Sequence, residues 1–427
     1  MITDNNKKLA QWAMDYALKN GCQAAKLVLY SNSNASFELR DAKMDRLQQA
    51  SESGLSISLY VDGRYGSYST NRLDKKELET FIKNGIESTR YLAVDEARVL
   101  PDASRYYKGG KPDLQLFDRR FETINPDDKV AIARAAAEEV LGKDSRIISV
   151  GTSYGDGESS SYRLTSNGFE GESKSTWFSL SADVALRGEG EARPSSYWYE
   201  SALFYDKLVK SGVGTKALER VLRKLGQKKV ASGKYTMVVD PMNASNLLSP
   251  VLSALYGSAL QQKNSFLLDK LNVKVGAGLL NLMDEPHLIG ASGARYFDSE
   301  GVATERRSIF EEGVLKTYFI DTYNSKKMGV EPTVNSPSLL VLKPGNKDLN
   351  GLVADVQKRE PLPLATWLAS LQDGPALALW LDGVGNPHNF GAILRSAAHF
   401  GVAGILLPAE SSLSLSGAAA RVADAST

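Results

Sequence analysis

Residues 236–262 read TMVVDPMNASNLLSPVLSALYGSALQQ, an apolar run followed by a longer segment with helical periodicity. The run at 236–241 predicts a strand. Residues 243–262 predict a helix, because apolar side chains recur at intervals of three and four residues. Asn243 or Ser245 is suited to cap this helix, and Asp240 lies just before it. The apolar positions predict a largely buried helix, and they are Leu247, Leu248, Val251, Leu252, Leu255 and Tyr256.

This predicted helix carries no metal ligand. A zinc peptidase that binds its metal on a helix needs two imidazoles one turn apart and a carboxylate that activates water. Residues 243–262 contain no His, Asp or Glu. We therefore expect the helix to be structural, and we expect no catalytic residue, no bound metal and no cofactor in this chain.

Three blocks of sequence carry a family resemblance, at residues 38–71, 234–271 and 296–329. The third contains FDSEGV followed by EEGVLKTY. Together they resemble the TldE/PmbA branch of the TldD/PmbA family, once called modulators of DNA gyrase, from residue 1 to about 359. In that family the TldD-type subunit bears an HExxxH zinc helix, whereas the TldE-type subunit has the equivalent helix without ligands. This chain resembles the second type.

Composition indicates a globular protein of two or three domains, since 42% of its 427 residues are hydrophobic. The net charge of +1 is too small to attract the chain as a whole to nucleic acid or to an anionic membrane. The lone cysteine, Cys22, fits a reducing compartment and predicts a small buried residue near a helix end. There is no signal-peptide core and no apolar run long enough to span a membrane. A cytoplasmic location without membrane contact is therefore expected.

The patterns predict an α+β fold with mainly antiparallel sheets. We expect an N-terminal α+β domain at 1–225 and a C-terminal domain at 226–359, with the boundary between 224 and 233. The family pattern breaks off near residue 359, so the second domain is expected to be truncated. Helices are expected at 5–20, 74–93, 129–141 (capped by Asn125) and 206–224. In the first domain, strands are expected at 24–31, 36–43, 44–53 and 54–70, the last with a hairpin at Asp62-Gly63. Alternating strands are expected through 146–202, with turns at 155–157 and 167–168. In the second domain, strands are expected at 273–286, 293–301 and 313–323.

Two groups of polar residues invite a chemical interpretation. His287 follows Asp284 and Glu285, which suggests a small metal site or simply a polar loop. Asp298 and Glu300 form a carboxylate pair suited to acid–base work or Ca²⁺, but the resemblance implies a structural turn at this place. The loop at 99–113 is rich in Tyr, Pro and Gly and is either a plain exposed loop or a grip for a peptide.

Residues 360–427 belong to another pattern. WLDGVGNPHNFGAILRSAAHFGVAGILL at 380–407 resembles the first motif of SpoU-type RNA 2′-O-ribose methyltransferases, which begins with a strand at 377–382. The resemblance implies RNA-phosphate contact at Asn389 and Arg395 and a partial α/β fragment. Two later motifs that build the S-adenosylmethionine site are not present, so no methyl-donor cofactor is expected.

The leading functional hypothesis is a non-catalytic partner subunit of a TldD-type zinc metallopeptidase that acts on small unfolded peptides. Its partner would be a TldD-type subunit in a heterodimer, or a second copy of itself. A strand-rich domain is able to hold an extended peptide at a sheet edge. One alternative is an RNA-binding or methyltransferase-related protein acting through the C-terminal segment. Another is a homodimeric peptide-binding module.

Overall fold

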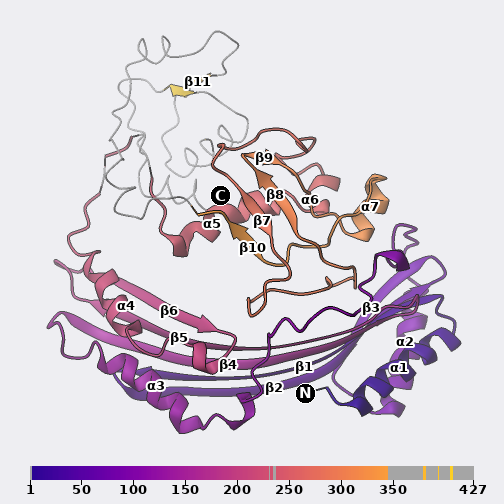
Figure 1. Cartoon of the computed structure of the whole chain (residues 1–427), viewed down its shortest axis with the longest axis horizontal. Coiled ribbons are helices and arrows are strands. Elements are labelled where there is room, and N and C mark those ends of the chain that lie inside the picture. The colour runs from indigo at the N-terminus through magenta and orange to yellow at the C-terminus, as the bar shows by residue number, and fades with distance from the viewer. Residues whose placement is uncertain are drawn as a thin grey trace.

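The computed structural model describes most of the chain before residue 345 and short pieces after it. The described residues are 2–229, 231–233, 237–344, 378–380, 393 and 404–406. They form a long curved sheet with helices packed against one face and a smaller C-terminal unit above the other (Figure 1). This is the predicted α+β class with mainly antiparallel sheets.

The large sheet has six antiparallel strands in the order β3-β2-β1-β4-β5-β6. They are β1 (Ala24–Arg40), β2 (Lys43–Val61), β3 (Arg64–Thr70), β4 (Ile147–Thr165), β5 (Glu170–Leu186) and β6 (Ser195–Ala202). The four strands expected between 24 and 70 are instead two long strands and the short β3. The first turn lies at Asp41-Ala42, where both residues adopt positive φ although neither is glycine. The predicted hairpin at Asp62-Gly63 is confirmed between β2 and β3.

The turn predicted at residues 155–157 is wrong, because this segment lies inside β4. A Cβ at Gly157 would lie 2.5 Å from Nε1 of Trp177 on β5, so glycine is needed for the indole to lie against β4. Asp156, between the two glycines, points into the core. The turn predicted at 167–168 is confirmed between β4 and β5, with Gly168 at φ 105°.

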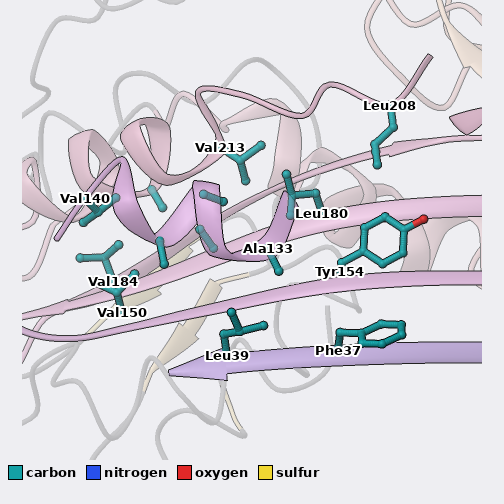
Figure 2. Close-up of a cluster of buried hydrophobic side chains, with 14 of the residues drawn as sticks. Phe37, Leu39, Ala133, Val140, Val150, Tyr154, Leu180, Val184, Leu208 and Val213 are labelled. Atoms are coloured by element: carbon teal, nitrogen blue, oxygen red, sulfur yellow. The ribbon is translucent and has the colours of Figure 1, made fainter. Parts of the chain in front are cut away.

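Two hydrophobic cores lie along one face of the sheet. On β1 the odd-numbered residues Leu27, Leu29, Phe37 and Leu39 are buried, so both cores use the same face. One core is covered by α1 (Asp4–Lys19) and α2 (Lys75–Thr89), and the other by α3 (Pro126–Glu138) and α4 (Val213–Leu222). Figure 2 shows the second core, with α3 seated on side chains from β1, β4 and β5.

Of the four helices that pack on the large sheet, three begin at a side chain that caps them. Side chains of Thr3, Asp74 and Asn125 cap α1, α2 and α3, and the Asn125 cap is as predicted. The helix expected at 206–224 begins only at Val213, because Gly212 adopts a left-handed conformation. Three short 3₁₀ turns complete the N-terminal part, at Ala103–Arg105, Phe121–Thr123 and Tyr205–Lys207. Cys22 is buried just after α1, as predicted.

The C-terminal unit is a small antiparallel sheet with three helices. Its strand order is β10-β7-β8-β9. The strands are β7 (Leu282–Asp284), β8 (Arg307–Glu311), β9 (Val314–Leu315) and β10 (Leu340–Leu342), and the helices are α5 (Pro241–Ser253), α6 (Gly257–Gln261) and α7 (Thr322–Met328). Residues 237–240 form no strand, 293–301 form turns, and α7 replaces the end of the strand expected at 313–323.

The helix expected at 243–262 is two helices, α5 and α6. Its cap is Asp240, whose carboxylate accepts a hydrogen bond from Met242 N at 2.8 Å. The break comes at Leu255 and Tyr256, because the main chain there pairs with Phe319, and Phe319 N donates to Leu255 O at 2.9 Å. The predicted burial is wrong for α5, all of whose residues are described and none of which is fully buried. Leu247 is 52% exposed.

The described pieces of the C-terminal segment are two short strands. β11 (Ala378–Trp380) and β12 (Gly404–Leu406) pair in parallel, as a βαβ unit requires. β11 falls within the strand predicted at 377–382. Asn389 and Arg395 lie outside the described residues. Among the helices that are described, none is long and apolar enough to cross a bilayer.

Candidate functional site

The α5–α6 segment offers no ligand set for a catalytic metal. Between Pro241 and Gln261 the polar side chains are only Asn, Ser, Tyr and Gln. Across the part of the chain that the structure describes, no group of three or more His, Cys, Asp or Glu side chains is arranged to hold a metal ion. Zinc in peptidases is held by imidazole and carboxylate ligands. These residues do not fit such a site, and no chemical step is assigned to a metal here.

His287 and its acidic neighbours turn to separate partners. His287 Nε2 lies 3.1 Å from Thr304 Oγ1, and burial lowers the pKa of the imidazole. Asp284 accepts from two main-chain amides at the start of β10, and Glu285 pairs with Arg306 at 2.8 Å. These contacts match the polar-loop interpretation of this stretch and not a metal site.

Asp298 and Glu300 hold a turn together. The buried Asp298 carboxylate accepts hydrogen bonds from Glu300 N, Val302 N and Asn335 N at 2.8–3.1 Å. Glu300 accepts from the main-chain N and the hydroxyl of Thr322 at the start of α7. Burial raises the pKa of Glu300. The two carboxylates therefore serve different neighbours, which agrees with the structural role that the resemblance implied.

The aromatic loop predicted at 99–113 joins this turn instead of standing free. Tyr107 N donates to Gly301 O at 3.1 Å, and Ala303 N donates to Arg105 O at 2.9 Å. The ring of Tyr107 stacks on Tyr296, with centroids 5.2 Å apart. The expectation of a fully exposed loop is thus wrong in part, because tertiary pairing fixes its first half against the C-terminal unit.

The end of the loop and the residues that follow it are anchored to both parts of the molecule. Gly290 N donates to Leu114 O at 2.7 Å from the C-terminal unit, and Thr176 N donates to Leu116 O at 3.0 Å from β5. The Tyr296 hydroxyl donates to Pro112 O at 2.7 Å. Residues 107–119 therefore lie between β5 of the large sheet and the C-terminal unit and are hydrogen-bonded to both.

Between these elements lies a cavity of about 740 Å³, which we call the aromatic–basic cleft. Its walls are the loop at 107–119, β4, β5 and the turn segment at 294–299. The side chains that give it its character are Tyr107, Tyr296, Phe297, Phe117, Arg163, Arg295, Lys111, Lys174 and Arg119, with Asp113, Glu172 and Asp298 as its acidic members. This volume lies in the range of small-ligand sites.

Arg163 is the most constrained cation of the cleft. Its side chain rises from the polar face of β4, opposite Val28 of β1, and one terminal nitrogen donates to Ser299 O at 3.3 Å. Its Nε is shielded from water and has no hydrogen-bond partner. Burial, with Arg295 nearby, lowers the pKa of the guanidinium. A buried donor without a partner costs free energy, and the guanidinium that carries it belongs to a side chain that lines the cleft.

Neither Arg163 nor Arg295 could be recognised as a site residue from the sequence. Arg163 lies in an alternating strand where a charged side chain indicates an exposed face. Arg295 directly precedes the aromatic pair Tyr296-Phe297, and its position against residues 336–338 depends on tertiary folding. The aromatic loop, as one of two interpretations, and Asp298 of the candidate carboxylate pair are the sequence features that lie at this cleft.

A second surface of interest is the open edge of the large sheet. β3 pairs with β2 only from Leu55 to Val61. Residues 43–53 of β2 pair with β1, and no other described strand lies along their outer side. All eleven of these residues are exposed. Such an edge presents main-chain groups to which an extended peptide is able to add as a strand.

Comparison with known families matches most of the chain. Three family models cover it in order, described as PmbA/TldA metallopeptidase domain 1 at residues 25–89, central domain at 119–225 and C-terminal domain at 232–359. A metalloprotease PmbA homolog of Haemophilus influenzae is 27% identical over 329 residues, which are 77% of this chain and 72% of that protein.

Solved structures with the same fold are also similar. A Bacteroides thetaiotaomicron protein described as a modulator of DNA gyrase is 75% identical, with a TM-score of 0.82 over 84% of this chain and 81% of its own. TldE of Thermococcus kodakarensis has a TM-score of 0.68 at 18% identity, over 82% of this chain and 80% of its own, and shares the fold.

The C-terminal segment matches a different protein. A 23S rRNA (guanosine-2′-O-)-methyltransferase of Coxiella burnetii, RlmB, is 40% identical over 80 residues. The match covers 18% of this chain and 32% of that enzyme. It supports the SpoU-like resemblance of this segment.

Proposed function

The chain belongs to the PmbA/TldD metallopeptidase family, and from this premise we propose that it is a non-catalytic subunit that binds small unfolded peptides beside a zinc-bearing, TldD-type partner. The observation that carries the proposal is the α5–α6 segment, which the family resemblance equates with the zinc helix and which contains no imidazole or carboxylate. Catalysis then depends on a second chain that supplies the metal. The complex acts in the cytoplasm, in keeping with the single reduced cysteine.

The peptide-binding part of the proposal is supported by two surfaces. The aromatic–basic cleft has the size and the mixture of aromatic and charged groups that suit a short peptide. The open edge of β2 at residues 43–53 offers unpaired main-chain groups to an extended chain. Both require an unfolded substrate, because a folded protein has its main chain already paired.

Purification of the tagged full chain from its native cells tests the proposal. We expect a family member with an HExxxH helix to co-purify in equal amounts. Zinc content and the cleavage of an unstructured peptide should be found only in fractions that contain this partner. The chain purified alone is expected to contain no stoichiometric zinc and to leave the peptide intact. One zinc ion per chain together with cleavage by the isolated chain would refute the proposal. A chain that binds peptide only as a dimer of itself would instead favour the homodimeric module.

A second candidate function rests on the C-terminal segment. The match to the rRNA methyltransferase and the parallel pairing of β11 with β12 favour an RNA-related role. Calorimetry of the full chain with S-adenosylmethionine and with an RNA hairpin tests it, using Arg395→Ala to remove the cation assigned to phosphate contact. RNA affinity that falls in this variant supports the role, and the absence of binding to either ligand removes it.

A further inference from the structure

The acidic side chains of the aromatic–basic cleft have direct contacts of their own. Glu172 pairs with Lys7 outside the cleft at 2.6 Å, and Asp113 accepts from Gln115 N at 2.9 Å. Asp298 is occupied by three main-chain amides. The direct contacts of these acidic members thus run to groups other than Arg163 and Arg295.

The two partly buried arginines donate hydrogen bonds to neutral oxygen atoms. Arg295 donates to the hydroxyls and carbonyls of residues 336–338 at 2.8–3.0 Å. Arg163 donates to Ser299 O, and its Nε has no hydrogen-bond partner. A guanidinium presents its donors as a planar fork that suits a carboxylate, and a charge shielded from water interacts strongly with an opposite charge. The cleft thus contains a guanidinium whose hydrogen bond goes to a neutral carbonyl, with Asp298 as an acidic group near enough to act on its charge.

The remaining walls favour a peptide over a nucleic acid. The stacked rings of Tyr107 and Tyr296 provide an apolar wall, and Lys111 lies 5.3 Å from the Tyr296 centroid. A polyanion needs a continuous basic surface, whereas this cleft also contains Glu172 and Asp113, and the chain has a net charge of only +1. The volume of about 740 Å³ suits a ligand of a few residues with one anionic group.

We infer that the aromatic–basic cleft binds a carboxylate group of a short peptide, with Arg163 as the residue that selects it. This inference rests on the proposed peptide-binding function and adds the feature of the peptide that is recognised. The carboxylate is the C-terminal one or an acidic side chain, and both present the same pair of oxygens. Binding pairs the Arg163 guanidinium with a carboxylate and places apolar side chains against the tyrosine wall.

The first test changes only the ligand. Calorimetry of the full chain compares an unstructured five-residue peptide with a free C-terminus, the same peptide amidated, and the amidated peptide with one internal Gln replaced by Glu. The peptide that carries the recognised carboxylate is expected to bind about tenfold or more tightly than the amidated Gln peptide, as for a charge-assisted pair. The arm that gains identifies the source of the carboxylate. Equal affinities for all three peptides would overturn the inference while leaving peptide binding intact.

The second test changes the chain. Arg163→Gln is expected to remove the preference for the carboxylate, and Arg163→Lys, which keeps the charge, to retain part of it. Arg72→Gln is the matched control, because Arg72 is exposed and distant from the cleft. A thermal melt of each variant checks folding. A preference that survives in a folded Arg163→Gln variant contradicts the inference. Competition by a single-stranded RNA oligonucleotide overturns the assignment to a peptide, and failure of every peptide to bind overturns the proposed peptide binding as well.

Discussion

A buried ion pair between α3 and β4 gives the sharpest stability prediction. Lys129 Nζ lies 2.5 Å from Asp156 Oδ2, and the two side chains are 10% and 0% exposed. The Tyr154 hydroxyl donates to the same oxygen at 3.1 Å, while Oδ1 has no partner. Figure 2 shows Tyr154 in the hydrophobic cluster where this pair is seated. We consider the changes Lys129→Met and Asp156→Asn, alone and together.

The two single changes are not equivalent. Removing one partner of a buried pair leaves an uncompensated charge and typically costs about 3–5 kcal/mol of unfolding free energy. Lys129→Met leaves a carboxylate that cannot reach water, so we expect the upper end of this range. Asp156→Asn leaves an ammonium group on a flexible stem that is 10% exposed and lies 5.7 Å from the Phe121 ring centroid, so we expect about 3 kcal/mol. The double variant removes both charges and should lose only about 1–2 kcal/mol, the cost of a polar group left without a full set of partners.

Urea unfolding followed by circular dichroism and tryptophan fluorescence measures these differences from the shift in midpoint. The exposed pair Arg72–Glu77, at 3.4 Å, is the control, and its removal should cost no more than about 1 kcal/mol. The unchanged chain, the two single variants at Lys129 and Asp156 and their double variant form a double-mutant cycle, and we expect a coupling energy of several kcal/mol. Additive single effects, or a larger loss for Asp156→Asn than for Lys129→Met, would refute the reasoning.

Two further predictions concern the C-terminal unit. Gly301→Ala should destabilise the protein more than Gly329→Ala, because both glycines have positive φ but only a Cβ at Gly301 would meet ring atoms of Phe169, at 2.7 Å. The positive φ alone should cost alanine about 1–2 kcal/mol of unfolding free energy at either position. Equal melting shifts for the two variants would contradict a contribution from the Phe169 ring contact. Burial lowers the pKa of His287, so the unfolded chain takes up its proton at higher pH than the folded chain. Stability should therefore fall as the pH drops below the ordinary histidine value of about 6.5, and His287→Gln should flatten this dependence in melts from pH 7.5 to 5, whereas an unchanged slope would contradict it.

Local signals in the sequence were reliable where interactions between neighbouring residues determine the backbone conformation. The Asn125 cap and the Asp62-Gly63 hairpin follow from side-chain hydrogen bonding and from the freedom of glycine at positive φ. The same reasoning failed at residues 155–157, where two glycines suggested a turn. There the glycines make room for Trp177 on the neighbouring strand, and this contact depends on the strand register.

The candidate site was less predictable than the fold, because its residues meet only after folding. Arg163 lies in β4, and Arg295 follows more than a hundred residues later in a turn. Each is bound by main-chain carbonyls of the C-terminal unit, a partner type that leaves no mark in the sequence. The aromatic loop was visible from its composition, but its anchoring on Gly301 and Gly290 was not.

The α5–α6 segment is positioned by contacts that do not involve a metal. Asp240 caps α5 and pairs with Arg220 of α4 at 2.9 Å, which ties the start of the segment to the N-terminal part. The main chain at its break pairs with Phe319, and Ser265 donates to Ala254 O at 2.6 Å. Main-chain and cap hydrogen bonds therefore hold this segment without any contribution from a metal ligand. An ordered helix pair without imidazole or carboxylate is the observation from which the proposed partner role starts, and the co-purification experiment tests that role.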